Sequence, residues 1–339
     1  MVFVSFGIRL RINIEAANMI ESFGNYVRHR IAPVVMKTKD GYRIVFAPTI
    51  SGQSIAHAYM RALTDLSLSR GLNLCDDCKN YKVIGGFLKR SGDPNTPSDD
   101  RVRTCVVDDV TGYMAAVENV STVMKRTSRI MFSYMVPDVD VAEATVMPQF
   151  HVRFNQQQNE NDIFQIESGS AIYMLGIGID VNGIGLLSNN THTDDYLERV
   201  ATTFDALISL FSGGYVGAKK SRYLPLIDVL GGVSAISDPI PFSVSSPKYG
   251  EYVKDTLNRA KAYVEALNNS NSSSKTINEK IIVIYFDKEG IINSDICKDY
   301  PKSNNIECEN AGNLDEMIKK TKDKALSWIK PSESTTSQK

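Results

Sequence analysis

Apolar and polar residues alternate regularly at the start of the chain. From residue 2 to residue 14 every even position is apolar, whereas Arg9, Arg11 and Asn13 lie between them. A period of two predicts a half-buried strand with one polar face. A polar loop is expected over residues 15–30. Asp40-Gly41, between two short apolar runs, predicts a hairpin turn.

Apolar residues that recur every three to four positions predict helices farther along the chain. A helix is expected to begin at Ser51, a good N-cap residue, and to continue through Leu66. Further helices are predicted at 194–212, 249–267 and 314–329, each with an apolar stripe. Strands are predicted at 130–136, 149–154, 171–181, 222–235 and 281–286, with a polar hairpin tip at 155–162.

The order of the strongest elements indicates the fold class. It runs strand, helix, two strands, helix, strand, which is the split βαβ or ferredoxin-like order that RRM domains use. A doubly wound sheet is excluded, because there a helix would separate every pair of strands. Residues 71–109 carry Cys, Asp, Pro and Ser without periodicity and are interpreted as an inserted, irregular segment. We therefore expect an α+β fold.

Composition limits the class of protein. The chain has 339 residues, of which 42% are hydrophobic, and a net charge of −1. It has no apolar run long enough to cross a membrane, and a cytoplasmic location is expected. A near-neutral charge does not exclude nucleic-acid binding, since binding needs only local positive potential. The basic residues gather in three clusters, at 28–30, 125–129 and 219–222.

The cysteines give weak support for a metal site. Cys75 and Cys78 form one CxxC pair, Cys105 is the only candidate third ligand nearby, and a fourth ligand is not evident. A structural zinc site normally has four ligands. The sequence thus favours chance cysteines or a local disulfide, and we predict no metal and no cofactor.

Five segments carry side chains suited to RNA. They are the loop at 18–30, the helix start at 51–57, the basic run at 125–129, the strand at 149–154 and the glycine-rich loop at 212–222. Aromatic, amide and cationic groups of this kind bind single-stranded RNA by stacking and by phosphate contact. Each segment alone also fits an ordinary surface loop or helix cap. Protease, esterase, Rossmann and Walker motifs are absent, so we do not expect an enzyme.

Taken in this order, several of these segments resemble a known family. The likeness rests on Glu21-Ser22-Phe23-Gly24-Asn25, on Pro48-Thr49-Ile50-Ser51-Gly52-Gln53-Ser54 and on Gly217-Ala218-Lys219-Lys220-Ser221-Arg222. It also includes Arg126-Thr127-Ser128-Arg129 and Gln149-Phe150-His151-Val152-Arg153-Phe154. Together they resemble the backbone subunit of type I-A Cascade, in the DevR-like CRISPR-associated autoregulator family.

The resemblance implies an RRM-like palm with an inserted helical region and a protruding hairpin, the thumb. The palm would comprise residues 1–70 and 125–245, with the thumb near 155–168 and the insertion at 71–124. Residues 246–330 would pack on the palm, and 331–339 would form a tail. The RNA-binding residues implied are Asn18, Ser22, Asn25, Arg28, His29, Arg30, Ser51, Gly52, Gln53, His57, Lys125, Arg126, Arg129, His151, Arg153, Gly214, Gly217, Lys219, Lys220 and Arg222.

The same resemblance implies the partners and the activity. They are CRISPR guide RNA, the complementary target DNA strand, further copies of the chain in a helical filament, and other Cascade subunits: an RNA-end-capping subunit, the small and large subunits and a helicase-nuclease. Related type III subunits cleave RNA through an Asp in the first loop. This chain has no Asp between residues 18 and 37, only Glu21 as a carboxylate, so we expect no nuclease activity.

Two other functions remain open from the sequence. A ferredoxin-like ribonuclease that processes precursor CRISPR RNA could use His29, His57 or His151 as a general acid or base. A transcriptional autoregulator is a weaker alternative, because the sequence shows no helix-turn-helix pattern.

Overall fold

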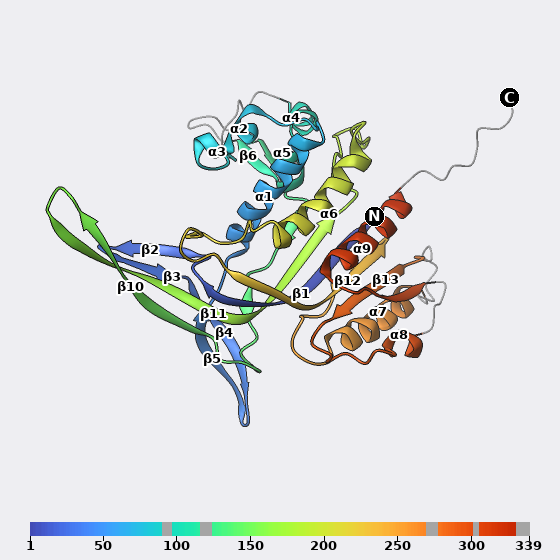
Figure 1. The fold of residues 1–339 in the computed structure, drawn as a ribbon. Coiled ribbons are helices and arrows are strands. Elements are labelled where there is room, and N and C mark those ends of the chain that lie inside the picture. The colour runs from blue at the N-terminus through green and yellow to red at the C-terminus, as the bar shows by residue number, and fades with distance from the viewer. Residues whose placement is uncertain (90–96, 116–123, 269–276, 301–304, 330–339) are drawn as a thin grey trace, which may run out of the picture.

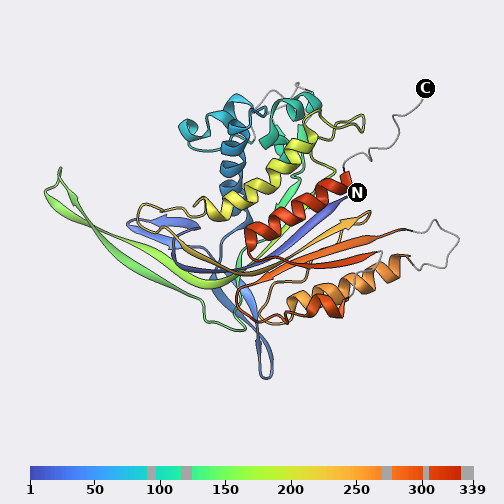
Figure 2. The ribbon, with the colours of Figure 1, turned by 45° about the vertical axis from the view of Figure 1, so that its right-hand side comes forward.

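A long mixed sheet with helices on both faces forms the centre of the molecule (Figures 1 and 2). The structure is a computed structural model, and it describes residues 1–89, 97–115, 124–268, 277–300 and 305–329. Helices and strands are both abundant in these residues, as expected for an α+β fold. No helix in the described ranges is both long and apolar enough to span a bilayer.

The first predicted strand is the central strand of this sheet. β1 pairs antiparallel with β11 on one side and with β12 on the other. Beyond β12, β13 is antiparallel to β12 and β14 is parallel to β13. Along β11, β8, β9 and β10 pair antiparallel and β3 pairs parallel, with β2 beyond β3. The strands of this sheet are β1 (Phe3–Glu15), β2 (Met19–Phe23), β3 (Tyr26–His29), β8 (Ile130–Phe132), β9 (Val136–Pro137), β10 (Thr145–Asn155), β11 (Glu160–Asp180), β12 (Leu226–Asp238), β13 (Lys280–Asp287) and β14 (Ile306–Asn310).

Three groups of helices surround the sheet. α1, α6 and α9 lie on one face, α7 and α8 lie on the other, and four short helices form a cap beside α1 together with the two-stranded sheet β6–β7 (Figure 1). The elements are α1 (Gly52–Ser69), α2 (Asp76–Lys79), α3 (Tyr81–Ile84), α4 (Ser98–Thr104), α5 (Val106–Thr111), β6 (Tyr113–Ala115), β7 (Met124–Arg126), α6 (Tyr196–Ser212), α7 (Tyr252–Asn268), α8 (Ile296–Asp299) and α9 (Leu314–Ile329).

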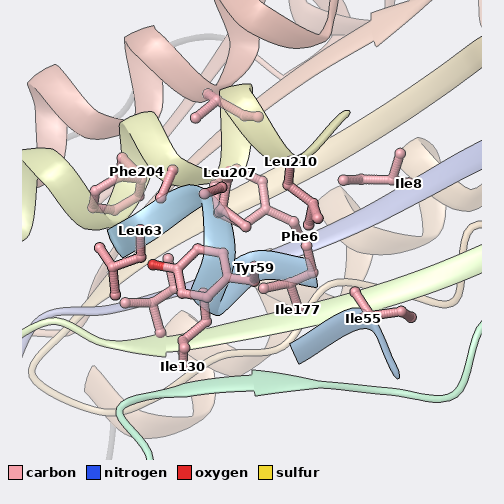
Figure 3. Packing of buried hydrophobic residues seen from close by; sticks show 14 of the residues in the cluster. Phe6, Ile8, Ile55, Tyr59, Leu63, Ile130, Ile177, Phe204, Leu207 and Leu210 are labelled. Carbon is pink, nitrogen blue, oxygen red and sulfur yellow. The ribbon is translucent and has the colours of Figure 1, made fainter. Parts of the chain in front are cut away.

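The main core lies between the sheet and the helices α1 and α6 (Figure 3). The even positions of β1 from Val4 to Ile12 are buried here, as the alternation predicted, whereas Ile14 at the end of the strand is exposed. Phe6 meets Phe204 of α6 edge to face at 6.4 Å between ring centroids. Tyr59 of α1 is fully buried, and its hydroxyl donates to the carbonyl oxygen of Thr203 at 3.0 Å, so its one polar group is satisfied.

The prediction of a half-buried first strand is wrong at Arg9. Its side chain is fully buried, and its guanidinium bonds Asp138 at 2.6 Å and Glu289 at 2.8 Å. Residues 243–247 pass over this part of the sheet, and a Cβ at Gly7 would lie 3.3 Å from Pro247. Both faces of β1 are therefore covered from residue 4 to residue 10, and the cation is paired where solvent was expected.

Two hairpins project from this body (Figures 1 and 2). β4 (Ile31–Thr38) and β5 (Gly41–Pro48) pair up to a turn at 39–40, which confirms the predicted turn. β10 and β11 pair up to Asn155 and Glu160, which confirms the predicted hairpin tip. Both hairpins carry large apolar side chains that are exposed to solvent.

Other segments differ from the predictions. The expected loop at 15–30 contains β2 and β3, and the expected irregular segment at 71–109 contains the helices α2 to α5. β14 was not predicted, and a disulfide joins Cys297 of α8 to Cys308 of β14. Short edge strands and helices of four to seven residues carry too few periods to be recognised from alternation alone.

Candidate nucleic-acid interface

The start of α1 is joined to the segment that follows β1. Ser51 caps the helix by accepting a hydrogen bond from the backbone N–H of Ser54 at 3.2 Å. Its hydroxyl donates to the side-chain oxygen of Asn18 at 3.0 Å, and Ser54 donates to the carbonyl of Ala17 at 3.2 Å. The backbone N–H of Arg30 donates to the carbonyl of Asn18 at 2.8 Å. The predicted segments 18–30 and 51–57 therefore meet.

Within this junction, the predicted residues divide into structural and exposed ones. Asn18 and Ser51 are buried against each other. A Cβ at Gly52 would lie 2.5 Å from the carbonyl oxygen of Phe132, so this glycine allows β8 to approach and does not open a space for ligand. Gln53 and His57, on the following turns, are exposed.

The glycine-rich loop after α6 lies beside the same helix. The guanidinium of Arg61 sits over the ring of Tyr215, 5.7 Å from its centroid. Burial, followed by the positive charge of Arg61, lowers the pKa of both His57 and Lys220. Arg61 of α1 therefore lies near both His57 and the residues Tyr215 and Lys220 of the loop. The helix α1 and the 214–222 loop thus share one side of the molecule. Gly217, with φ +113°, makes the turn that L side chains rarely adopt.

The end of that loop contacts the base of the β10–β11 hairpin. Arg222 lies over the ring of Phe164, 5.5 Å from the centroid, and His151 stacks on the same ring at 5.2 Å. His151 also hydrogen-bonds the hydroxyl of Tyr223. Phe164 and Tyr223 belong to a small apolar cluster that includes Val27 of β3. The loop and β3, which are distant from the hairpin in sequence, thus converge on it.

Several predicted cations are available for ligand on this surface. Among the described residues, the side chains of Arg28, Arg153 and Lys219 make no hydrogen bond or ion pair, and all three are exposed. The Nε of Arg30 is buried and has no partner within the described ranges. Lys220 donates to the carbonyl of Gly214 at 2.8 Å. Ser22, Asn25 and Gly214 are exposed beside these cations, on β2–β3 and in the loop.

His29, predicted to bind RNA, is instead a buried structural residue. Its Nε2 lies 2.6 Å from Glu15, and its Nδ1 lies 2.7 Å from the carbonyl of Arg30. Tyr173 donates to the same Glu15 carboxylate at 2.9 Å. Burial alone would lower the pKa of His29, but the hydrogen bond and charge of Glu15 outweigh it, and the pKa is raised above 6.5.

The pair predicts a pH dependence of stability. In the unfolded chain the pKa of His29 has its ordinary value of 6.5. Above pH 6.5 the unfolded chain therefore loses the proton that His29 still holds in the folded protein. The free energy of unfolding should then fall as pH rises from 6.5 through the raised folded pKa. Urea unfolding over a pH series measures this fall. His29→Gln should flatten it, whereas His57→Gln should keep it, because the pKa of His57 is lowered. If the free energy of unfolding fell equally steeply with pH in the parent and in His29→Gln, the fall could not be assigned to His29.

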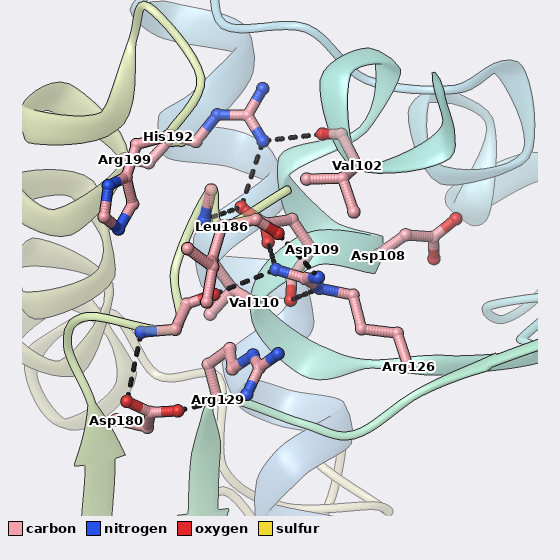
Figure 4. Close-up of polar contacts among 12 residues, drawn as sticks. Val102, Asp108, Asp109, Val110, Arg126, Arg129, Asp180, Leu186, His192 and Arg199 are labelled. Atoms are coloured by element: carbon pink, nitrogen blue, oxygen red, sulfur yellow. Dashed lines mark hydrogen bonds and ion pairs between the residues drawn. The ribbon is translucent and has the colours of Figure 1, made fainter. Parts of the chain in front are cut away.

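Arg126 and Arg129 also have roles that differ from the prediction (Figure 4). Arg126 pairs with the fully buried Asp109 and donates to the carbonyls of Gly183 at 2.9 Å and Leu186 at 3.2 Å. Arg129 pairs with Asp180 at 3.0 Å. Their guanidinium groups are thus engaged inside the protein, which replaces the prediction that they grip RNA.

The 125–129 segment is also far from the other predicted residues. Asp180 ends β11, whereas Phe164 lies near its hairpin end, and roughly 50 Å of strand separates them at about 3.3 Å per residue. Lys125 is exposed but lies on β7, beside the cap. The structure therefore brings the segments 18–30, 51–57, 151–153 and 214–222 together and leaves 125–129 apart. Arg61 and Phe164 belong to this surface but were not predicted, because a single Arg or Phe carries no local signal.

Comparisons with known proteins point to one family. The family model described as "CRISPR-associated negative auto-regulator DevR/Csa2" matches residues 6–257. "CRISPR-associated protein Cas7/Csa2 1" of Saccharolobus solfataricus is 32% identical over 323 residues, which is 87% of this chain and 96% of that protein. "CRISPR-associated protein Cas7/Cst2/DevR" of Thermoproteus tenax is 26% identical, covering 96% of this chain and 95% of that protein.

Solved structures agree at the level of the fold. A chain of a "CRISPR RNA-guided surveillance complex" matches with a TM-score of 0.50 and 14% identity, covering 95% of this chain and 99% of that chain. A chain of a "CRISPR RNA-guided surveillance complex, pre-nicking" matches with a TM-score of 0.52 and 12% identity, covering 95% and 100%.

Proposed function

The chain belongs to the DevR/Csa2 family of CRISPR-associated proteins, the family of type I-A Cascade backbone subunits, and from this premise we propose that it binds guide RNA along its sugar–phosphate chain without cleaving it. The observation that carries the proposal is the convergence of α1, the 214–222 loop and the base of the β10–β11 hairpin on one side of the molecule. This surface combines free cations with aromatic rings, the two groups that bind single strands without reading their sequence.

The sheet order supports an RRM-like palm for residues 1–70 and 125–245. β12, β1, β11 and β8 lie side by side, all antiparallel, and α1 and α6 follow β1 and β11 in the chain. This is the order of the split βαβ fold. Residues 243–247 and α7 cover the face on which RRM domains stack bases. RNA therefore runs over the loops and the hairpin, and the cap formed by α2 to α5 is the inserted region.

The histidines do not favour the alternative ribonuclease. All four lie in described residues, and no two of them contact each other. His29 is buried on Glu15, His151 is stacked on Phe164, and the ring of His57 meets Phe87 edge to face at 5.6 Å. Cleavage that uses one histidine as general base and another as general acid needs both of them at one phosphate. A neutral His57 suits contact with a ribose or base instead.

Assembly along RNA needs two different surfaces on each copy, because a head-to-tail contact is heterologous. One candidate is the β4–β5 hairpin, whose exposed apolar residues lie on one face: Ile31, Val35, Tyr42, Ile44 and Phe46. The other is an apolar groove of about 590 Å³, lined in part by Phe3, Met131 and Tyr134. A second copy of this chain is the occupant that suits both. The β10–β11 hairpin acts as the thumb, and the bases held outside it pair with target DNA beside the other Cascade subunits.

Binding of single-stranded RNA as a function of salt tests the proposal. Replacing Lys219, Lys220 and Arg222 by Ala should weaken binding to all RNA sequences and reduce the salt slope by about two units, at roughly 0.7 per lost phosphate contact. Lys125→Ala is the matched control, since it removes an exposed cation away from the converging segments, and it should leave the slope unchanged.

Three outcomes would contradict the proposal. If the salt dependence of RNA binding were the same in the Lys219, Lys220 and Arg222 triple variant as in the parent, the 214–222 loop would not be part of the RNA-binding surface. Cleavage of repeat RNA at one position would favour the ribonuclease. Duplex DNA bound more tightly than RNA at equal salt would favour the autoregulator.

A further inference from the structure

The cap contains a cluster of metal-ligand atoms that the proposed function does not use. One side-chain donor each from Cys75, Cys78, Cys105 and Asp108 lies within 4.8 Å of the other three. Cys78, Cys105 and Asp108 are buried, and Cys75 is partly exposed. We propose that these four side chains bind one Zn²⁺ ion, which fastens the two ends of the cap together.

The spacing of the ligands follows the pattern of a zinc site. Cys75 and Cys78 form one half, and Cys105-Val106-Val107-Asp108 repeats the two-residue gap with a carboxylate in the last place. Structural zinc takes four ligands from Cys, His, Asp or Glu, commonly in two such pairs. From the sequence alone a fourth ligand was not evident. The folded cap supplies both Cys105 and Asp108, so the prediction of no metal is replaced.

The donor atoms lie close enough together for a tetrahedral site. With Zn–S bonds of about 2.3 Å, sulfur atoms in a tetrahedral site lie about 3.8 Å apart. The observed limit of 4.8 Å requires only a contraction of about 1 Å or less. The backbone N–H of Asp108 already donates to the Sγ of Cys105 at 3.4 Å, the kind of bond that stabilises a thiolate ligand.

The surrounding charges balance such a site. Zn²⁺ with three thiolates and one carboxylate carries two net negative charges, which are costly to bury without compensation. Lys89 bonds one oxygen of Asp108 at 2.8 Å, and Arg101 bonds the other at 2.9 Å. These two cations neutralise the loaded site and orient the carboxylate.

The site joins segments that the chain separates. Cys75 and Cys78 lie at α2, whereas Cys105 and Asp108 lie before and within α5. Apart from the metal, a backbone bond from Val106 to the carbonyl of Asn73 at 3.0 Å links the same two places. Zinc would close the intervening loop and fix the cap on α1.

The zinc content of the purified full-length chain tests this directly. Elemental analysis of tag-free protein should give about one zinc per chain, and the chelated protein should rebind Co²⁺ with the absorption bands of a tetrahedral, thiolate-bound ion. A Cys297→Ser/Cys308→Ser variant should keep the zinc, since that disulfide lies elsewhere. Cys105→Ser should lose it.

Two further variants separate ligation from packing. Asp108→Cys should retain zinc at full stoichiometry, because it completes a second CxxC, whereas Asp108→Ala should bind it at least tenfold more weakly. Lys89→Met should weaken affinity by about 10- to 100-fold, as loss of a residue that orients a ligand does. Wild-type protein without zinc that does not bind Co²⁺, a disulfide between two of these cysteines, or iron in place of zinc would each overturn the assignment.

Discussion

Replacing Asp109 with Asn should lower the free energy of unfolding by about 3 to 5 kcal/mol. The carboxylate of Asp109 is fully buried, and one of its oxygens pairs with Arg126. The other oxygen pairs with Arg199 at 3.0 Å and accepts a hydrogen bond from the backbone N–H of Gly185 at 2.8 Å. Arginine cannot shed its charge by deprotonation, so Arg126 would remain charged and buried with no acid partner among the described residues. Urea unfolding measures the loss.

The matched control for this change is Asp100→Asn. Asp100 is exposed, and within the described part of the chain its carboxylate pairs only with Arg103, one helical turn away. Exposed pairs of this kind contribute little, so its loss should change stability by no more than about 0.5 kcal/mol. A loss below about 1 kcal/mol for Asp109→Asn would mean that water or other groups satisfy the two arginines, and that the network does not fasten the cap to α6.

Replacing Ile44 and Phe46 together by Ser should abolish self-assembly on RNA while leaving the monomer folded. These side chains are 65% and 72% exposed on one face of the β4–β5 hairpin. Burial of each against a neighbouring copy would contribute about 1.5 to 3 kcal/mol, so the loss of both should weaken the contact by about 100-fold or more. Sedimentation of the protein on RNAs of increasing length measures it.

Val83→Ser is the control for the hairpin variant. Val83 is 88% exposed, but it lies on α3 in the cap and not on the β4–β5 hairpin. It should leave assembly and stability unchanged. If the hairpin variant formed particles of the same size as the parent on each RNA, the apolar face of β4–β5 would not be the contact between copies.

The sequence predicts which positions of a strand or helix face the core. It does not predict which residues pair with the polar side chains. The buried even positions 4–12 of β1, the hairpin turn near Asp40 and the helix starting at Ser51 all follow from local chemistry. Arg9 shows the limit. The same alternation that identifies the strand places Arg9 on a polar face, and residues far away in sequence, Asp138 and those of 243–289, convert that face into interior.

The basic clusters show the same limit within the candidate site. His29 and Arg126 resemble surface cations in sequence, but Glu15 and Asp109 meet them only in the folded chain. Lys219 and Arg222 have the same local appearance and remain exposed. Charge runs therefore locate candidate surfaces but cannot separate ligand-binding cations from those neutralised by long-range ion pairs.

The central position of β1 has a consequence for biosynthesis. β1 leaves the ribosome well before both of its neighbours, because β11 ends at Asp180 and β12 ends at Asp238. At about 5 to 20 residues per second, β1 would wait with unpaired edges, roughly 8 to 33 seconds for β11 and roughly 11 to 45 seconds for β12. An apolar strand in that condition is prone to intermolecular pairing. Productive folding of the nascent chain thus depends on keeping β1 apart from other chains until translation has passed Asp238.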